Sequence, residues 1–290
     1  MNNLSLFLTC VAIWGTTWLA ITFQLGPVAP EVSVSHRFLL AALLIAAWCR
    51  IRGLPLRFKP AEHVALALMG GLMYGAAYIA VYHAELHLAS GLVAIGYSAS
   101  PLVSSLGTRL FLRQPVSARQ LLGSVLGLAG ICLVYWPEFG KLAPDRSVLL
   151  GIAFTAGAVL FSCSGGLLAQ RNHQQGLHGW PTMAWSMGYG ALVSLAIALA
   201  LGRAYTIDLG APYLLSLLYL AVLGTVITFA GWLTLVGRIG AARASYVGVM
   251  APVVALFVST AFEGFAWHAL TFAGVAISVA GNILVLAEKR

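Results

Sequence analysis

Three tyrosines recur at intervals of four residues in one apolar segment, as Tyr74, Tyr78 and Tyr82, and His83 follows the last of them. Side chains four residues apart lie near one another on a helix. In a bilayer each hydroxyl needs a hydrogen-bond partner, so a row of them facing lipid is costly. The spacing predicts either one wall of a polar cavity or a mixture of interfacial contacts and helix packing. We expect the cavity, because Tyr74 and Tyr78 lie too deep for an interfacial belt.

Two prolines each follow a tyrosine within a few residues. Tyr97 and Ser98 precede Pro101, and Tyr246 precedes Pro252. A proline inside a helix lacks the N–H that the carbonyl four residues earlier would accept, so this carbonyl is freed. A ligand or a small polar neighbour can then bind the free carbonyl. Each proline predicts either a simple kink or a hinge that offers backbone groups to a substrate.

Two further aromatic residues are candidates for the same cavity. Trp14 lies in the middle of an apolar segment beside Gly15, and Phe229 lies in the second half of the chain. Tryptophan is also common at the membrane interface, so an interfacial position remains the alternative for Trp14. Arg37 lies near the end of its segment and is expected either to extend to the interface or to act as a gate or carboxylate partner.

The composition of the chain is typical of a membrane protein. Of its 290 residues, 60% are hydrophobic and only 8% are charged, and the mean hydropathy is +0.92. These values exclude a soluble enzyme, a nucleic-acid-binding module and a disordered chain. Metal-hydrolase, serine-hydrolase and phosphate-loop motifs are also missing from the sequence, so we expect no enzymatic activity, no metal and no organic cofactor.

Ten segments are apolar and long enough to cross the hydrocarbon, which takes about 20 residues. Twelve of the 16 lysines and arginines fall on one side if both termini are cytoplasmic, in agreement with the positive-inside rule. The sequence therefore predicts an all-α membrane protein with short links and both termini in the cytoplasm. The segments are 4–24, 32–49, 63–83, 90–111, 120–136, 148–169, 181–201, 212–234, 241–262 and 267–287.

A shift of 151 residues lays the second half of the chain on the first. Pro101 then falls on Pro252, Gly123 on Gly274, and Phe229 takes the position of Tyr78. Each half holds five segments, so the second half must be inserted upside down. The basic residues that mark a cytoplasmic link in the first half are replaced by uncharged residues in the second. This pattern predicts two inverted five-helix repeats, residues 1–138 and 147–290, as in many secondary transporters.

The chain resembles the EamA-type branch of the drug/metabolite transporter superfamily, and within it the YddG-type exporters of aromatic amino acids. The features that carry the resemblance are the Trp-Gly stretch at 13–18, the Arg-Phe pair at 37–38, the prolines at 101 and 252, and the glycines at 123, 130, 274 and 281.

This resemblance implies a function and a location. We expect a transporter of the bacterial inner membrane that exports small metabolites, amino acids including aromatic ones being the first choice. It would work by alternating access through a cavity between the repeats. A multidrug or other metabolite exporter and a passive channel are the alternatives. The expected partners are the substrate and the lipid bilayer, without nucleic acid or an obligate protein partner.

Overall fold

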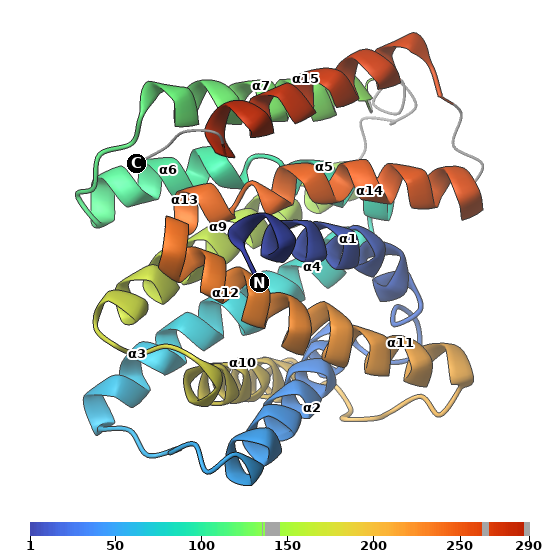
Figure 1. Cartoon of the computed structure of the whole chain (residues 1–290). Coiled ribbons are helices and arrows are strands. Elements are labelled where there is room, and N and C mark those ends of the chain that lie inside the picture. Colours follow the sequence, from blue (N-terminus) through green and yellow to red (C-terminus); the bar gives the residue numbers. More distant parts are fainter. Residues whose placement is uncertain (135, 137–145, 263–266, 287–290) are drawn as a thin grey trace.

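The computed structural model describes residues 1–134, 136, 146–262 and 267–286, and these form helices and short links without a strand. Ten helical stretches follow one another, and several of them are broken into shorter elements (Figure 1). In chain order they are α1 (Asn3–Thr22), α2 (Pro30–Ile51), α3 (Pro60–Gly70) with η1 (Gly71–Ala76) and α4 (Ala77–Glu85), α5 (Ser90–Tyr97) with α6 (Ser100–Phe111), α7 (Ala118–Val134), α9 (Arg146–Gln174), α10 (Trp180–Ala200), α11 (Ala211–Ala221) with η2 (Val222–Ile227) and α12 (Thr228–Ile239), α13 (Ala241–Ala244) with α14 (Val247–Phe262), and α15 (Ala269–Leu286).

Each predicted segment coincides with one of these stretches, so the all-α membrane fold with ten helices is confirmed. Seven stretches in the described part of the chain are long and apolar enough to cross a membrane. Helices α7 and α15 are apolar but shorter, and the fourth stretch is divided between α5 and α6. Large apolar side chains such as Leu43 and Leu149 are more than half exposed, as expected for a surface that faces lipid tails.

Several helices begin where the sequence places a proline in the first turn. Pro30, Pro60, Pro181 and Pro212 all occupy the first or second helical position, where the missing N–H costs nothing and the fixed backbone angle suits the helix. Gly240 separates α12 from α13 with a φ of 83°, a conformation that glycine adopts without strain. The chain therefore reverses there without a loop.

The helix boundaries repeat with the 151-residue period. Helix α11 starts 151 residues after α3, α13 starts 151 after α5, and α15 starts 151 after α7. The two π-helical turns, η1 at 71–76 and η2 at 222–227, obey the same shift. In each of them a backbone N–H reaches back five residues, from Ala77 to Leu72 and from Thr228 to Leu223. The duplication is thus visible in a local irregularity as well as in the regular helices.

Helices α7 and α15 lie side by side at one edge of the bundle, while α2, α3 and α10 form the opposite edge (Figure 1). The contact between α7 and α15 depends on glycine. A Cβ on Gly130 would lie 2.5 Å from the carbonyl oxygen of Gly274, and one on Gly281 would lie 2.7 Å from that of Gly123. Small residues at the interface allow this close approach of the two helices.

Candidate functional site

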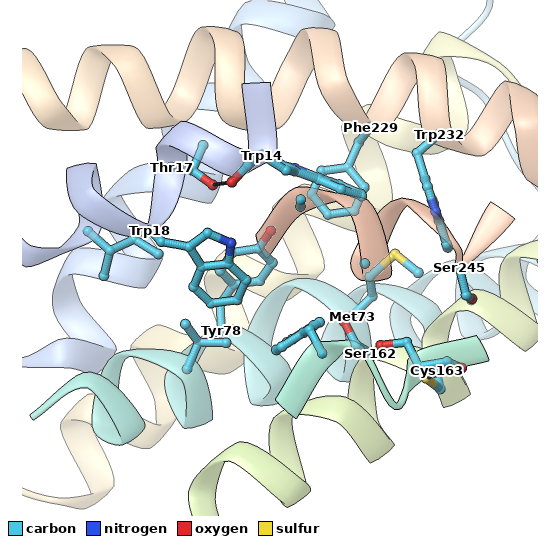
Figure 2. Close-up of a pocket in the computed structure, with 17 residues that line it drawn as sticks. Trp14, Thr17, Trp18, Met73, Tyr78, Ser162, Cys163, Phe229, Trp232 and Ser245 are labelled. Carbon is cyan, nitrogen blue, oxygen red and sulfur yellow. Dashed lines mark hydrogen bonds between the residues drawn. The ribbon is translucent and has the colours of Figure 1, made fainter. Parts of the chain in front are cut away.

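A cavity lies between helices of both repeats, in the middle of the bundle. Its volume is about 90 Å³, enough for roughly three water molecules. Figure 2 shows the aromatic side chains that enclose it together with smaller polar ones. The aromatic residues are Trp14 and Trp18 of α1, Tyr78 of α4, Tyr97 of α5, and Phe229 and Trp232 of α12.

The aromatic residues form two groups. Trp14 packs edge-on against Phe229, with ring centroids 5.1 Å apart, and both lie 6.2 Å from Trp232. Trp18 packs edge-on against Tyr97 at 5.3 Å. Such edge-on pairs are favoured by the charge distribution of the rings and hold them in fixed orientations. The two groups therefore present rigid, mainly apolar surfaces to whatever enters the cavity.

The remaining lining combines apolar side chains, those of Ile21, Met73 and Val81 among them, with small polar ones. Thr17, Ser100, Ser162, Cys163 and Ser245 line the cavity beside the aromatic rings. None of the residues that line it is charged. Ligand sites commonly combine apolar walls with a few polar groups that orient the ligand, and this lining has that character.

Four of the nine residues predicted for the cavity line it, namely Trp14, Tyr78, Tyr97 and Phe229. Tyr74 does not: it is fully buried and packs edge-on against the far side of this wall, 4.9 Å from the ring of Phe229. Ser98 is also fully buried, at the break between α5 and α6, and its hydroxyl has no hydrogen-bond partner in the part of the chain that the structure describes.

Three other predicted residues take part in contacts away from the cavity. The hydroxyl of Tyr82 donates to Gln24 Oε1 at 2.8 Å. His83 Nε2 lies 2.6 Å from Glu31 Oε1. Tyr246 donates to the carbonyl oxygen of Gln120 at 2.5 Å and thereby joins the α13–α14 break to α7. These side chains hold helices together around the cavity rather than lining it.

The two predicted hinge prolines have different surroundings. Pro101 lies in the first turn of α6, directly after the break in the fourth stretch, and the carbonyl of Tyr97 that it frees faces Gly248 of α14. Pro252 lies inside α14, whereas the ninth stretch breaks earlier, at Ser245 and Tyr246. The break at Pro101 agrees with the prediction, and the one expected at Pro252 is displaced toward the start of its stretch.

Sequence reasoning missed Trp18 and Trp232 as cavity residues. Both had a usable signal, because Trp18 follows Trp14 by four residues and Trp232 follows Phe229 by three. Residues at these intervals lie on the same face of a helix. A search for aromatic neighbours at helical spacing would have added both.

Arg37 lies deeper than the sequence indicated. It is the eighth residue of α2, and only 1% of its surface is exposed. Its Nε donates to Thr225 Oγ1 at 2.9 Å, and its Nη2 donates to the carbonyl oxygen of Gly224 at 3.4 Å. The indole N–H of Trp14 donates to the same carbonyl at 3.1 Å. Extension of Arg37 to the interface is therefore contradicted, because its guanidinium binds the π-helical turn η2 of the other repeat.

The family model for EamA-like transporters matches residues 2–136 and again residues 149–287. The chain belongs to the EamA-like transporter family. This match confirms the resemblance to EamA-type transporters, and it shows that the chain is a membrane transporter with two repeats.

Relatives of this EamA-like transporter cover nearly its whole length. It is 25% identical to Protein PecM of Dickeya dadantii, over 90% of this chain and 84% of that protein. It is also 25% identical to the uncharacterized inner membrane transporter YedA of Escherichia coli K12, over 96% of this chain and 88% of that protein. A crystal structure of a protein with 17% sequence identity superposes with a TM-score of 0.78, covering 96% of this chain and 94% of the other, which shows the common fold.

Proposed function

We propose that this protein exports small, partly apolar metabolites across the bacterial inner membrane by alternating access, and that amino acids, including aromatic ones, are its substrates. The observation that carries the proposal is the cavity between the repeats, enclosed by six aromatic rings and a few hydroxyl groups. Aromatic walls bind an apolar side chain, while hydroxyls and freed carbonyls can orient a polar end. The names of the relatives PecM and YedA do not identify a substrate, so the proposed substrate class rests on the chemistry of the cavity wall.

The size of the cavity supports a mechanism in which the walls move. At about 90 Å³ it is smaller than ligand sites of about 300–1,000 Å³. A substrate the size of an amino acid would enter only if helices of the two repeats parted. The break between α5 and α6 beside the cavity provides a place where the backbone can bend, and broken helices at the repeat interface are typical of such transporters.

The orientation in the membrane belongs to the same proposal. We infer that residues 1–138 and 147–290 are the two inverted units, with both termini in the cytoplasm. The support is the excess of lysine and arginine on one side, twelve of 16, together with the even number of helical stretches.

Purified protein in liposomes tests the proposal. Vesicles loaded with one unlabelled amino acid are placed in trace labelled amino acid, and saturable counterflow is measured for phenylalanine, leucine and alanine. We expect counterflow that saturates and that is fastest for phenylalanine. Flux without saturation or counterflow would indicate the passive channel, and counterflow of cationic drugs in place of amino acids would indicate the multidrug exporter.

A further inference from the structure

Arg37 is a buried cation with a free donor beside the cavity. Two of its three nitrogens bind η2, and the hydroxyls of Tyr78 and Tyr82 interact with the guanidinium. Nη1 is shielded from solvent, and no acceptor among the described residues lies within hydrogen-bond geometry of it. Arg37 also makes no ion pair with any carboxylate that the structure describes. An unpaired charge in a low-dielectric interior is costly, and a charged residue inside a membrane helix usually serves transport. Nη1 is therefore available to donate a hydrogen bond to a ligand.

The guanidinium lies directly behind the cavity wall. Its carbon Cζ is 4.5 Å from the ring centroid of Tyr78, which lines the cavity. On the other side, the position that a Cβ on Gly224 would occupy is 2.8 Å from Thr17, another wall residue, and 3.4 Å from Arg37 Nη2. A small displacement of Tyr78 or Thr17 would bring Nη1 into contact with the contents of the cavity.

The bonds to η2 alone do not account for the charge. Thr225 Oγ1 and the Gly224 carbonyl are neutral acceptors, and a neutral amide such as glutamine could donate to them at a lower desolvation cost. Glu85 is buried in the same half of the bundle and interacts electrostatically with Arg37. However, neither of its carboxylate oxygens has a hydrogen-bond partner among the described residues, so Glu85 does not occupy the free donor of Arg37.

We propose that Arg37 binds a carboxylate of the substrate, which makes organic carboxylates, amino acids among them, the substrate class of this cavity. The carboxylate accepts from Nη1 when the wall at Tyr78 opens, while the apolar part of the substrate lies among the aromatic rings. This inference rests on the proposed transport function and adds a fixed positive charge to a site whose walls are otherwise uncharged.

The test compares ligands that differ only in this charge. Phenylalanine, leucine and benzoate are each paired with the corresponding neutral amide, phenylalaninamide, leucinamide and benzamide. Binding to the purified protein is measured by isothermal titration calorimetry. A charge-assisted hydrogen bond predicts that at least one carboxylate binds about 10- to 100-fold more tightly than its amide.

Variants assign this preference to Arg37. Arg37→Gln should remove the preference for the carboxylate while keeping the amide affinity, and Arg37→Lys, which retains the charge, should keep a part of it. Arg52→Gln is the matched control, because Arg52 also stacks on an aromatic ring, that of Trp48, but is exposed at the end of α2. It should leave the preference unchanged.

Two results would overturn the proposal. The first is a wild-type protein that shows no carboxylate preference in any of the three pairs, and the second is a preference that survives in Arg37→Gln.

Counterflow separates this failure from a failure of the transport function. Saturable counterflow that ignores the carboxylate would refute the role of Arg37 alone, whereas carboxylate binding without counterflow would refute transport by this mechanism alone. If Arg37→Gln does not fold, the wild-type pairs and Arg37→Lys still decide the question.

Discussion

Replacement of Tyr78 by alanine removes one ring from the cavity wall. This ring packs edge-on against Phe38 at 4.8 Å and lies under the guanidinium of Arg37. A substrate would lose an aromatic contact, worth about 0.5–1.5 kcal/mol, and a hydrogen bond to the hydroxyl, worth about 0.5–1.5 kcal/mol. The sum of about 1–3 kcal/mol corresponds to a loss of affinity of about 5- to 150-fold.

The assay is the concentration dependence of counterflow in liposomes, normalised to the amount of folded protein found by size-exclusion chromatography. Tyr82→Ala is the matched control, one turn further along α4. Tyr82 is fully buried and donates to Gln24 rather than lining the cavity. Its loss should lower the melting temperature and the yield of folded protein, but it should lower the affinity of the surviving protein much less than Tyr78→Ala does.

The reasoning fails if Tyr78→Ala transports with wild-type affinity, because Tyr78 would then be a packing residue. It also fails if Tyr82→Ala lowers affinity as much as Tyr78→Ala, because the division between wall and support would then be wrong.

Two further changes test the packing and the topology. Gly130→Leu should lower the melting temperature in detergent, because its Cβ would lie 2.5 Å from the carbonyl oxygen of Gly274 and overpacking costs about 1–3 kcal/mol. The control is Gly157→Leu, whose Cβ would lie 3.9 Å from the ring of Phe161, and it should have little effect. Equal melting temperatures of the two variants would contradict the packing argument. A reporter that works only in the cytoplasm should be active when fused after Arg290. Activity of an alkaline phosphatase fused at this position, which requires the periplasm, would contradict the proposed orientation.

The helices were predictable because hydrophobicity dominates their formation in a bilayer. Once backbone groups must bond within the segment, an apolar run of sufficient length becomes a helix whatever its detailed sequence. The repeat was predictable for a different reason, because prolines and glycines recur in both halves of the chain with the same spacing of 151 residues, as Pro101 and Pro252 do. The glycines at 123, 130, 274 and 281 are visible in the sequence, and their small size permits the contact between α7 and α15.

The tyrosine row was only partly predictable because the helix that carries it is not regular. Tyr74 belongs to η1, whereas Tyr78 lies in α4 after the wide turn has ended. A π-helical turn contains an additional residue, so it rotates the faces of the helix before and after it relative to each other. Even in a regular helix, a step of four residues advances by about 40° beyond a full turn. The three rings consequently point to Phe229, to the cavity and to Gln24 in turn.

The depth of Arg37 could not be read from its distance to the end of an apolar segment. Helix α2 starts at Pro30, two residues before the predicted segment, and the position of the side chain depends on acceptors from the distant η2. The displaced break near Pro252 has a comparable cause. Tyr246 is fixed by its hydroxyl to α7, a contact between segments more than 120 residues apart that no local pattern encodes.

The shared position of η1 and η2 also bears on the history of the molecule. A wide turn arises when one residue is inserted into a helix, and two separate insertions would rarely fall on the same position of both halves. The shared position indicates that the five-helix unit contained this turn before it was duplicated.

The two copies have since diverged in how they fill the space beside the turn. Beside η2, the large side chain comes from the neighbouring helix α1, whose Trp14 donates to the carbonyl oxygen of Gly224. Beside η1, the large and the small residue are exchanged. Gly165 of α9 is equivalent to Trp14, and it packs against Met73 of η1, which is equivalent to Gly224. A symmetric ancestor would have had inward-facing and outward-facing states of equal energy. This exchange removes that equality, so the present protein is expected to rest with its cavity biased toward one side of the membrane.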